Sequence, residues 1–195
     1  MTKWMLVVAW LALAAIPAEA FNNQRKGFVL GAGLGAAGTT FSQELKENGT
    51  LAEETDSETK PSVLSDFKIG FGPSDQMLIY YFSHVTWFSI ENVFENDVTI
   101  ANGVGGLGVT YFLRPQAPCW FVEGGIGFAS WATPFEENSR SMTGFGIWLG
   151  AGHEFSRHWM VEVSVGSGNP SDEEYDLKAT TKATTIGISV NYLGY

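Results

Sequence analysis

The stretch ATTIGISVNYLGY, residues 183–195, alternates two kinds of side chain. Ile186, Ile188, Val190 and Tyr192 fall on one face of an extended strand, while glycine, serine and asparagine fall on the other, because side chains alternate across a strand. A soluble sheet would turn the apolar face towards a core. A membrane-spanning antiparallel barrel gives the same pattern with the apolar face turned towards lipid. The rest of the sequence has to distinguish the two.

The same alternation recurs between turn-forming residues along the chain and predicts eight strands. Each is close to the ~9–11 residues that a tilted strand needs to cross a bilayer, or slightly longer. An even number is typical of single-chain bacterial barrels. The predicted strands are Lys26–Gly38, Ser62–Gly72, Met77–Phe88, Thr99–Leu113, Cys119–Trp131, Ser141–Phe155, Trp159–Ser167 and Ala183–Tyr195.

Short and long connections alternate strictly between these strands. Short polar or proline-containing links follow the second, fourth and sixth strands, at residues 73–76, 114–118 and 156–158. Transmembrane barrels have this asymmetry, with short turns in the periplasm and longer loops outside the cell. The first and last long links are rich in carboxylates and poor in apolar residues, so we expect them to be solvated and mobile. The long links are Thr39–Pro61, Ser89–Val98, Ala132–Arg140 and Gly168–Lys182.

The second face of the strands favours the membrane barrel over a soluble barrel. It combines glycines with charged residues, a poor lining for the apolar cavity of a soluble barrel. As the exterior of a soluble barrel, the same face would expose mostly glycine. Turned inward, the glycines help to close a narrow barrel and the charges can pair. Two strands are less regular. Residues 78–88 are apolar on both faces, and the glycines of residues 101–108 predict a bulge or register change.

The inward charges are predicted to meet in one polar network. Counting residues from the periplasmic ends places most of them in neighbouring layers, at a rise of ~3.3 Å per residue. Lys68 is the expected cationic centre, and an arginine, Arg25, Arg114 or Arg157, is expected to reach the network from the rim. A second interpretation is an ion path, although eight-stranded interiors are normally filled. The predicted network consists of Asp66, Lys68, Glu123, Glu154, Glu162 and Asn191.

Aromatic residues on the outward face are concentrated near strand ends. This placement is typical of the aromatic girdles that lie at the headgroup level of a membrane. Trp87 or Phe88, together with Phe128, approaches the opposite interface. The girdle predicted at the short-turn end consists of Phe28, Phe71, Tyr111, Trp120, Phe155, Trp159 and Tyr192.

The amino terminus predicts export. Lys3, the apolar stretch of residues 4–16 and the Ala18-Glu19-Ala20 cleavage pattern describe a signal peptide over residues 1–20, followed by one domain over residues 21–195. A net charge of −10 argues against a nucleic-acid partner, because binding to phosphates requires a basic protein surface. The single cysteine, Cys119, leaves no internal disulfide and is interpreted as a small apolar residue at a strand start.

The chain resembles the small eight-stranded outer-membrane proteins of Gram-negative bacteria, the OmpA-barrel, OmpX and OmpW-like group. The resemblance rests on the strand number, the loop asymmetry and the aromatic carboxy-terminal strand over Lys26–Tyr195. It implies an all-β, eight-stranded, antiparallel, up-and-down transmembrane barrel in the Gram-negative outer membrane. It also implies contact with outer-membrane lipid and lipopolysaccharide, and with the barrel-assembly machinery during biogenesis.

The expected function is non-enzymatic: an envelope-structural or surface-interaction role through acidic extracellular loops. Narrow transport of small apolar molecules is the first alternative, and it requires a lateral opening or an apolar lumen near residues 77–113. A lipid A-modifying enzyme is a further alternative that needs a serine, a histidine and a carboxylate together. His153 and His158 belong to the periplasmic end, and Ser164 has no histidine near it in sequence. We therefore expect no catalytic residues, no metal and no cofactor.

Overall fold

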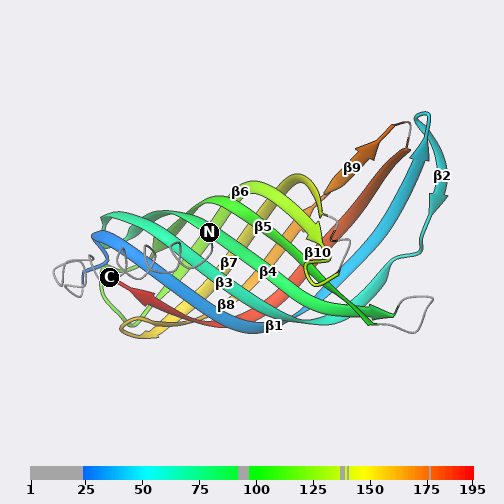
Figure 1. The fold of residues 1–195 in the computed structure, drawn as a ribbon. Coiled ribbons are helices and arrows are strands. Elements are labelled where there is room, and N and C mark those ends of the chain that lie inside the picture. Colours follow the sequence, from blue (N-terminus) through cyan, green and yellow to red (C-terminus); the bar gives the residue numbers. More distant parts are fainter. Residues whose placement is uncertain (1–23, 92–96, 137–138, 140, 176) are drawn as a thin grey trace, which may run out of the picture.

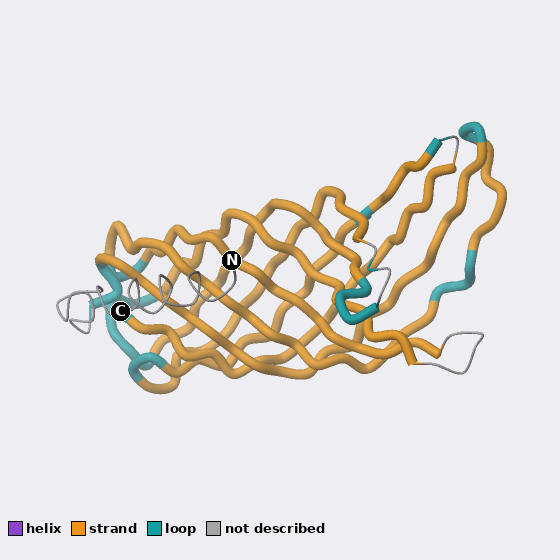
Figure 2. Tube along the Cα trace, in the orientation of Figure 1, coloured by secondary structure: helices purple, strands orange, loops and turns teal. Residues whose placement is uncertain are grey.

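The computed structural model describes residues 24–91, 97–136, 139, 141–175 and 177–195. The predicted signal peptide lies outside them. The described chain is almost entirely strand, with the connections at the two ends (Figure 2). No helix among the described residues is long and apolar enough to cross a membrane. The strands are β1 (Gly27–Glu47), β2 (Thr50–Glu54), β3 (Glu58–Ser74), β4 (Met77–Glu91), β5 (Asp97–Phe112), β6 (Cys119–Ala132), β7 (Ser141–Ser156), β8 (Trp159–Gly168), β9 (Ser171–Glu174) and β10 (Leu177–Gly194).

Eight of these strands close into an antiparallel barrel (Figure 1). Neighbours in sequence pair around the barrel from β3 to β8, and β10 pairs with both β8 and β1. The closing pair runs without a register shift from Leu30 opposite Gly194 to Glu47 opposite Leu177. The predicted eight-stranded up-and-down barrel is therefore confirmed, and its strand bounds lie within a few residues of the prediction except in β1, β3 and β10.

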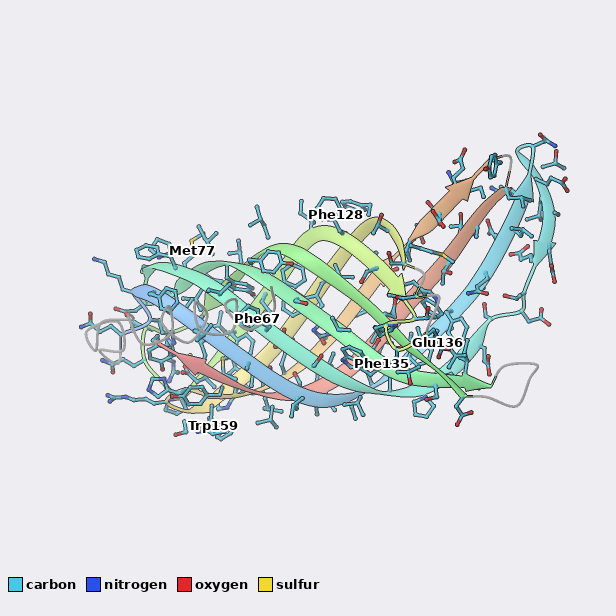
Figure 3. The ribbon with its side chains drawn as sticks, viewed as in Figure 1. Phe67, Met77, Phe128, Phe135, Glu136 and Trp159 are labelled. Carbon is cyan, nitrogen blue, oxygen red and sulfur yellow. The ribbon has the colours of Figure 1, made fainter. Side chains whose placement is uncertain are left out.

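The alternation of side chains separates a buried interior from an apolar exterior. In β10, Ile186, Ile188 and Val190 are about half exposed, whereas Ser189 and Asn191 are buried. Soluble proteins rarely expose a continuous apolar surface of more than a few hundred Å². Figure 3 shows the exposed side chains of Phe128 and Trp159 projecting from the outside of the barrel, and Phe67 is exposed as well. The barrel wall is therefore suited to lipid.

The two irregular strands are resolved by their pairing. In β4, Leu78, Tyr80 and Phe82 point inward, and Tyr81 and Ile79 point outward. The pairing of β5 with β4 and β6 is continuous, so the predicted bulge or register change is wrong. Glycine permits the regular register here rather than interrupting it, because a Cβ at position 106 would lie 2.2 Å from the Ile126 carbonyl oxygen.

Two long links are structured, contrary to the prediction that they are mobile. The β1–β10 pair continues beyond the barrel rim, and β2 and β9 add one strand on each side of this extension (Figure 1). The strands need no apolar core, because the register already set in the barrel lets the backbone hydrogen bonds continue. We call this four-stranded extension the acidic platform: residues 41–47 of β1, all of β2 and β9, and residues 177–182 of β10.

Candidate functional site

The interior of the barrel carries a buried ionic cluster centred on Lys68. The Lys68 Nζ atom lies 3.0 and 2.9 Å from the two carboxylate oxygens of Glu123 and 3.0 Å from Glu162 Oε2. Asp66 Oδ2 is farther away, at 3.5 Å. These four residues come from three strands, β3, β6 and β8, and all are buried. The cluster therefore ties opposite walls of the barrel together.

Neutral groups complete the surroundings of two of the carboxylates. The hydroxyls of Tyr80 and Thr110 lie 2.9 and 2.7 Å from Glu123 Oε2 and donate hydrogen bonds to it. Asn191 Nδ2 donates to Glu162 Oε2 at 3.0 Å. The Lys68 ammonium also lies 4.9 Å from the centre of the Trp148 ring, within the range of a cation–π interaction. Glu123 is thus the best-satisfied carboxylate of the cluster.

Glu154 does not join this cluster, although it was predicted to be part of the same network. It pairs with Arg25 nearer the short-turn end of the barrel, and the Tyr195 hydroxyl donates to it at 2.7 Å. The register explains the separation. Glu123 is opposite Gly150, so Glu154 lies four residues farther along β7, about 13 Å at ~3.3 Å per residue. The interior therefore contains two ionic layers rather than one.

Cys119 belongs to the Arg25 layer. Its Sγ atom lies 3.2 Å from Arg25 Nη2, and the Arg25 guanidinium is 3.9 Å from the centre of the Phe112 ring. The thiol is buried and free. Cys119 thus packs at a strand start as a small buried residue.

A histidine lies beside the Lys68 cluster in a way that the sequence did not predict. His84 Nε2 is 3.4 Å from Ser164 Oγ, and His84 Nδ1 is 3.9 Å from Asp66 Oδ1. Ser164 has no histidine near it in the sequence, but His84 lies next to it in the folded barrel. The two residues are 80 positions apart in sequence and on strands that do not pair, so no local motif could reveal the contact.

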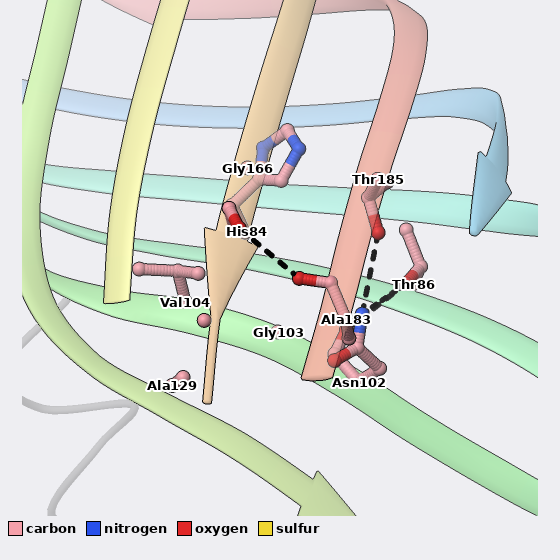
Figure 4. A pocket seen from close by; sticks show the side chains of 11 residues that line it. His84, Thr86, Asn102, Gly103, Val104, Ala129, Gly166, Ala183 and Thr185 are labelled. Carbon is pink, nitrogen blue, oxygen red and sulfur yellow. Dashed lines mark hydrogen bonds between the residues drawn. The ribbon is translucent and has the colours of Figure 1, made fainter. Parts of the chain in front are cut away.

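A small cavity lies next to His84 in the lumen. Figure 4 shows Thr86, Asn102 and Thr185 gathered there, with Asn102 Nδ2 donating to both threonine hydroxyls at 3.3 and 3.2 Å. Ser164 does not line this cavity. An apolar cluster lies in the lumen on the side of the acidic platform. That cluster consists of Phe41, Phe88, Ile100, Trp131 and Ala183.

Comparison with solved structures identifies the architecture. The outer membrane protein OprG from Pseudomonas aeruginosa is 12% identical and aligns with a TM-score of 0.50 over 89% of this chain and 99% of its own. The chain has the fold of the small outer-membrane β-barrels. The barrel also aligns with Ail of Yersinia pestis, at 14% identity, a TM-score of 0.42 and coverage of 84% and 99%. No family model matches the sequence, and no curated protein does.

The side chains of the predicted aromatic girdle lie on the outer surface of the barrel. Phe28 is partly buried, and the other six side chains are about half exposed or more: Phe71, Tyr111, Trp120, Phe155, Trp159 and Tyr192. Trp159 packs edge-on against Tyr192, with ring centroids 5.4 Å apart. At the opposite end, Trp87 points outward, whereas Phe88 is buried in the lumen.

Proposed function

We propose that this outer-membrane barrel is a non-enzymatic surface protein whose acidic platform binds a basic polypeptide segment. The observation that carries the proposal is the platform itself: a paired, four-stranded sheet standing beyond the rim at the end away from Tyr195 (Figure 1). With the carboxy terminus in the periplasm, this end faces the outside of the cell. A rigid sheet can present charges at fixed spacing, which a mobile loop cannot.

The charge of the platform supports a basic partner. Its three lysines make their ion pairs with only two carboxylates: Lys46 and Lys182 with Glu44, and Lys178 with Glu173. Glu47, Glu53 and Asp172 make no ion pair among the described residues. They are exposed or partly exposed, so a partner can reach them. The platform therefore offers a surplus of accessible negative charge.

The filled lumen favours this role over transport. The alternative of apolar transport requires an opening near β4 and β5, yet these strands pair continuously from Met77 opposite Tyr111 to Glu91 opposite Asp97. The lumen beside them contains the large side chains of Tyr80 and Phe82 and the apolar cluster around Phe88. Detergent-bilayer conductance and ligand uptake by the full barrel would test transport directly.

The buried position of Ser164 favours a non-enzymatic role. His84 and Asp66 stand near it in the order that a hydrolase uses. However, all three are buried, Ser164 does not line the cavity beside His84, and 3.9 Å is too long for a hydrogen bond between His84 and Asp66. We expect lipid A to have the same mass with and without the protein.

Binding of a labelled lysine-rich peptide to the barrel in lipid nanodiscs tests the proposal. Wild type should bind the peptide, and binding should weaken as salt rises, because exposed charges are screened over about 10 Å at 0.1 M salt. The variant E47Q/E53Q/D172N should lose binding by about tenfold or more, the effect of roughly 1.4 kcal/mol.

The control variant D75N/D97N/E136Q removes the same number of charges away from the platform. It should bind as wild type does. Equal losses in the two variants would show that binding depends on net charge alone. Absence of binding by wild type at low salt would also contradict the proposal.

A further inference from the structure

Three potential metal ligands converge inside the barrel beside Lys68. Asp66 of β3, His84 of β4 and Glu162 of β8 each offer one ligand atom, and these atoms all lie within 4.8 Å of one another. Each residue is no more than 5% exposed. This juxtaposition is separate from the acidic platform and plays no part in the function proposed for it.

The converging atoms lack hydrogen-bond partners. Both carboxylate oxygens of Asp66, the Nδ1 atom of His84 and the Oε1 atom of Glu162 are buried without one. Leaving a buried polar atom unsatisfied costs about 1–3 kcal/mol. Lys68 does not remove this cost, because its close contacts go to Glu123 and to the other oxygen of Glu162. Unpartnered polar atoms of all three side chains therefore face one another inside the barrel.

The charge balance of the layer points the same way. Asp66, Glu123 and Glu162 surround a single lysine, so three carboxylates face one ammonium group in a water-poor interior. Burying a charge without compensation is costly. A divalent cation on the side of Asp66 and Glu162 away from Lys68 would neutralise the excess.

The geometry around His84 fits coordination better than direct pairing. The 3.9 Å between His84 Nδ1 and Asp66 Oδ1 exceeds a hydrogen bond, but two ligands at ~2.0–2.2 Å from one ion can be up to about 4 Å apart. On its other side, His84 Nε2 faces Ser164 Oγ at 3.4 Å, and the ring packs 5.4 Å from Trp148. Metal-bound histidines typically have such an outer partner, which fixes the ring.

We propose that Asp66, His84 and Glu162 bind one divalent transition-metal ion inside the barrel. An imidazole with two carboxylates suits Zn²⁺ or Mn²⁺, whereas Ca²⁺ and Mg²⁺ take oxygen ligands. Of the three ligands, only His84 lines the cavity that contains Thr86, Asn102 and Thr185, so the ion itself lies outside that cavity (Figure 4). The bound ion links β3, β4 and β8 across the lumen.

Zinc binding to the full mature protein, folded in detergent and stripped of metal, tests this site. Wild type should bind an equimolar amount of Zn²⁺ in competition with a chromogenic chelator. Asp66→Asn and His84→Asn should abolish this binding. Ser164→Ala should weaken it by about 10–100-fold, the usual effect of an outer-shell partner. X-ray absorption of the wild-type complex should show one imidazole nitrogen with carboxylate oxygens.

His153→Asn provides the matched histidine control, because His153 lies on β7 at the short-turn end and packs against Trp120. It should retain full zinc binding. Heat-modifiable electrophoretic mobility establishes that each variant is folded. The X-ray absorption spectrum of the wild-type complex tests the site even if a variant does not fold. Absence of stoichiometric zinc in wild type, full binding by folded His84→Asn, or a spectrum with several imidazoles would each overturn the site.

Discussion

At the scale of single residues, the stability of the interior depends on how completely each buried charge is paired. Among the described residues, Lys68 is the only lysine or arginine within 4.0 Å of the carboxylates of Asp66, Glu123 and Glu162. Replacing both members of a buried ion pair with apolar groups is often tolerated, but removing one partner leaves a buried charge uncompensated. The lysine should therefore matter more than any one carboxylate beside it.

We predict that Lys68→Met lowers the free energy of unfolding by about 3–5 kcal/mol, the typical cost of breaking a buried pair. Urea titration of the barrel in detergent micelles, followed by tryptophan fluorescence, measures the change. Lys182→Met is the control, because that lysine pairs with Glu44 on the exposed platform. Similar losses for the two variants would contradict a dominant role for the buried cluster.

At the scale of elements, the platform is held by backbone pairing and by ion pairs across its strands. Lys182 donates a hydrogen bond to Glu44, and this bond, the largest cause, holds the pKa of the Glu44 carboxyl below its ordinary value of 4.5. The folded pKa is the lower one, so the pair stabilises the platform fully above pH 4.5 and is lost as the pH falls through the lowered value.

We predict that Lys182→Met raises the titration midpoint of Glu44 towards its ordinary value. Carbon-13 NMR of the glutamate carboxyl groups measures that midpoint. Lys178→Met should leave it unchanged, because Lys178 pairs with Glu173 on the other side of β10. An unchanged Glu44 midpoint in Lys182→Met would show that the contact does not form in solution.

The sequence predicts the barrel strands well and the platform poorly, for a physical reason. Barrel strands separate apolar from small or polar residues, and this alternation is visible in one strand alone. The platform strands are polar on both faces. They are ordered by the pairing of β1 with the distant strand β10, as in Glu44 opposite Thr180, and β2 and β9 pair with the outer edges of these two strands.

The candidate site is likewise predicted from the sequence only in part. Alternation predicts that Lys68, Glu123 and Glu162 point inward, but the stagger between strands decides which charges meet. That stagger separates Glu154 from Lys68 and brings His84 to Ser164. Neither the Arg25–Glu154 pair nor the His84–Ser164 contact follows from spacing within one strand, because each joins residues that are far apart in sequence.

At the scale of the whole molecule, the apolar belt fixes how the barrel sits in the membrane. Leu149 lies near the middle of β7 and faces outward, at 58% exposure. Leu177 is similarly exposed, at 47%, but it belongs to the platform. Leu149→Arg should therefore cost about 2–4 kcal/mol, as charged residues do at the bilayer midplane. Leu177→Arg should cost far less.

Unfolding of these two variants in lipid bilayers measures the difference, and folding in detergent provides a reference without a bilayer. The difference should shrink in detergent. Equal costs in bilayers would place the platform within the membrane and contradict the surface role proposed for it.

The pairing of β1 with β10 also determines how the barrel has to be assembled. These strands come from the two ends of the described chain, and β10 is the last to be synthesised. Until it arrives, β1 and β8 each present an unpaired edge. Lipid offers no substitute for the missing hydrogen bonds. A chain that stops before residue 177 should therefore form no stable barrel in a membrane, because the edges of β1 and β8 would stay unpaired.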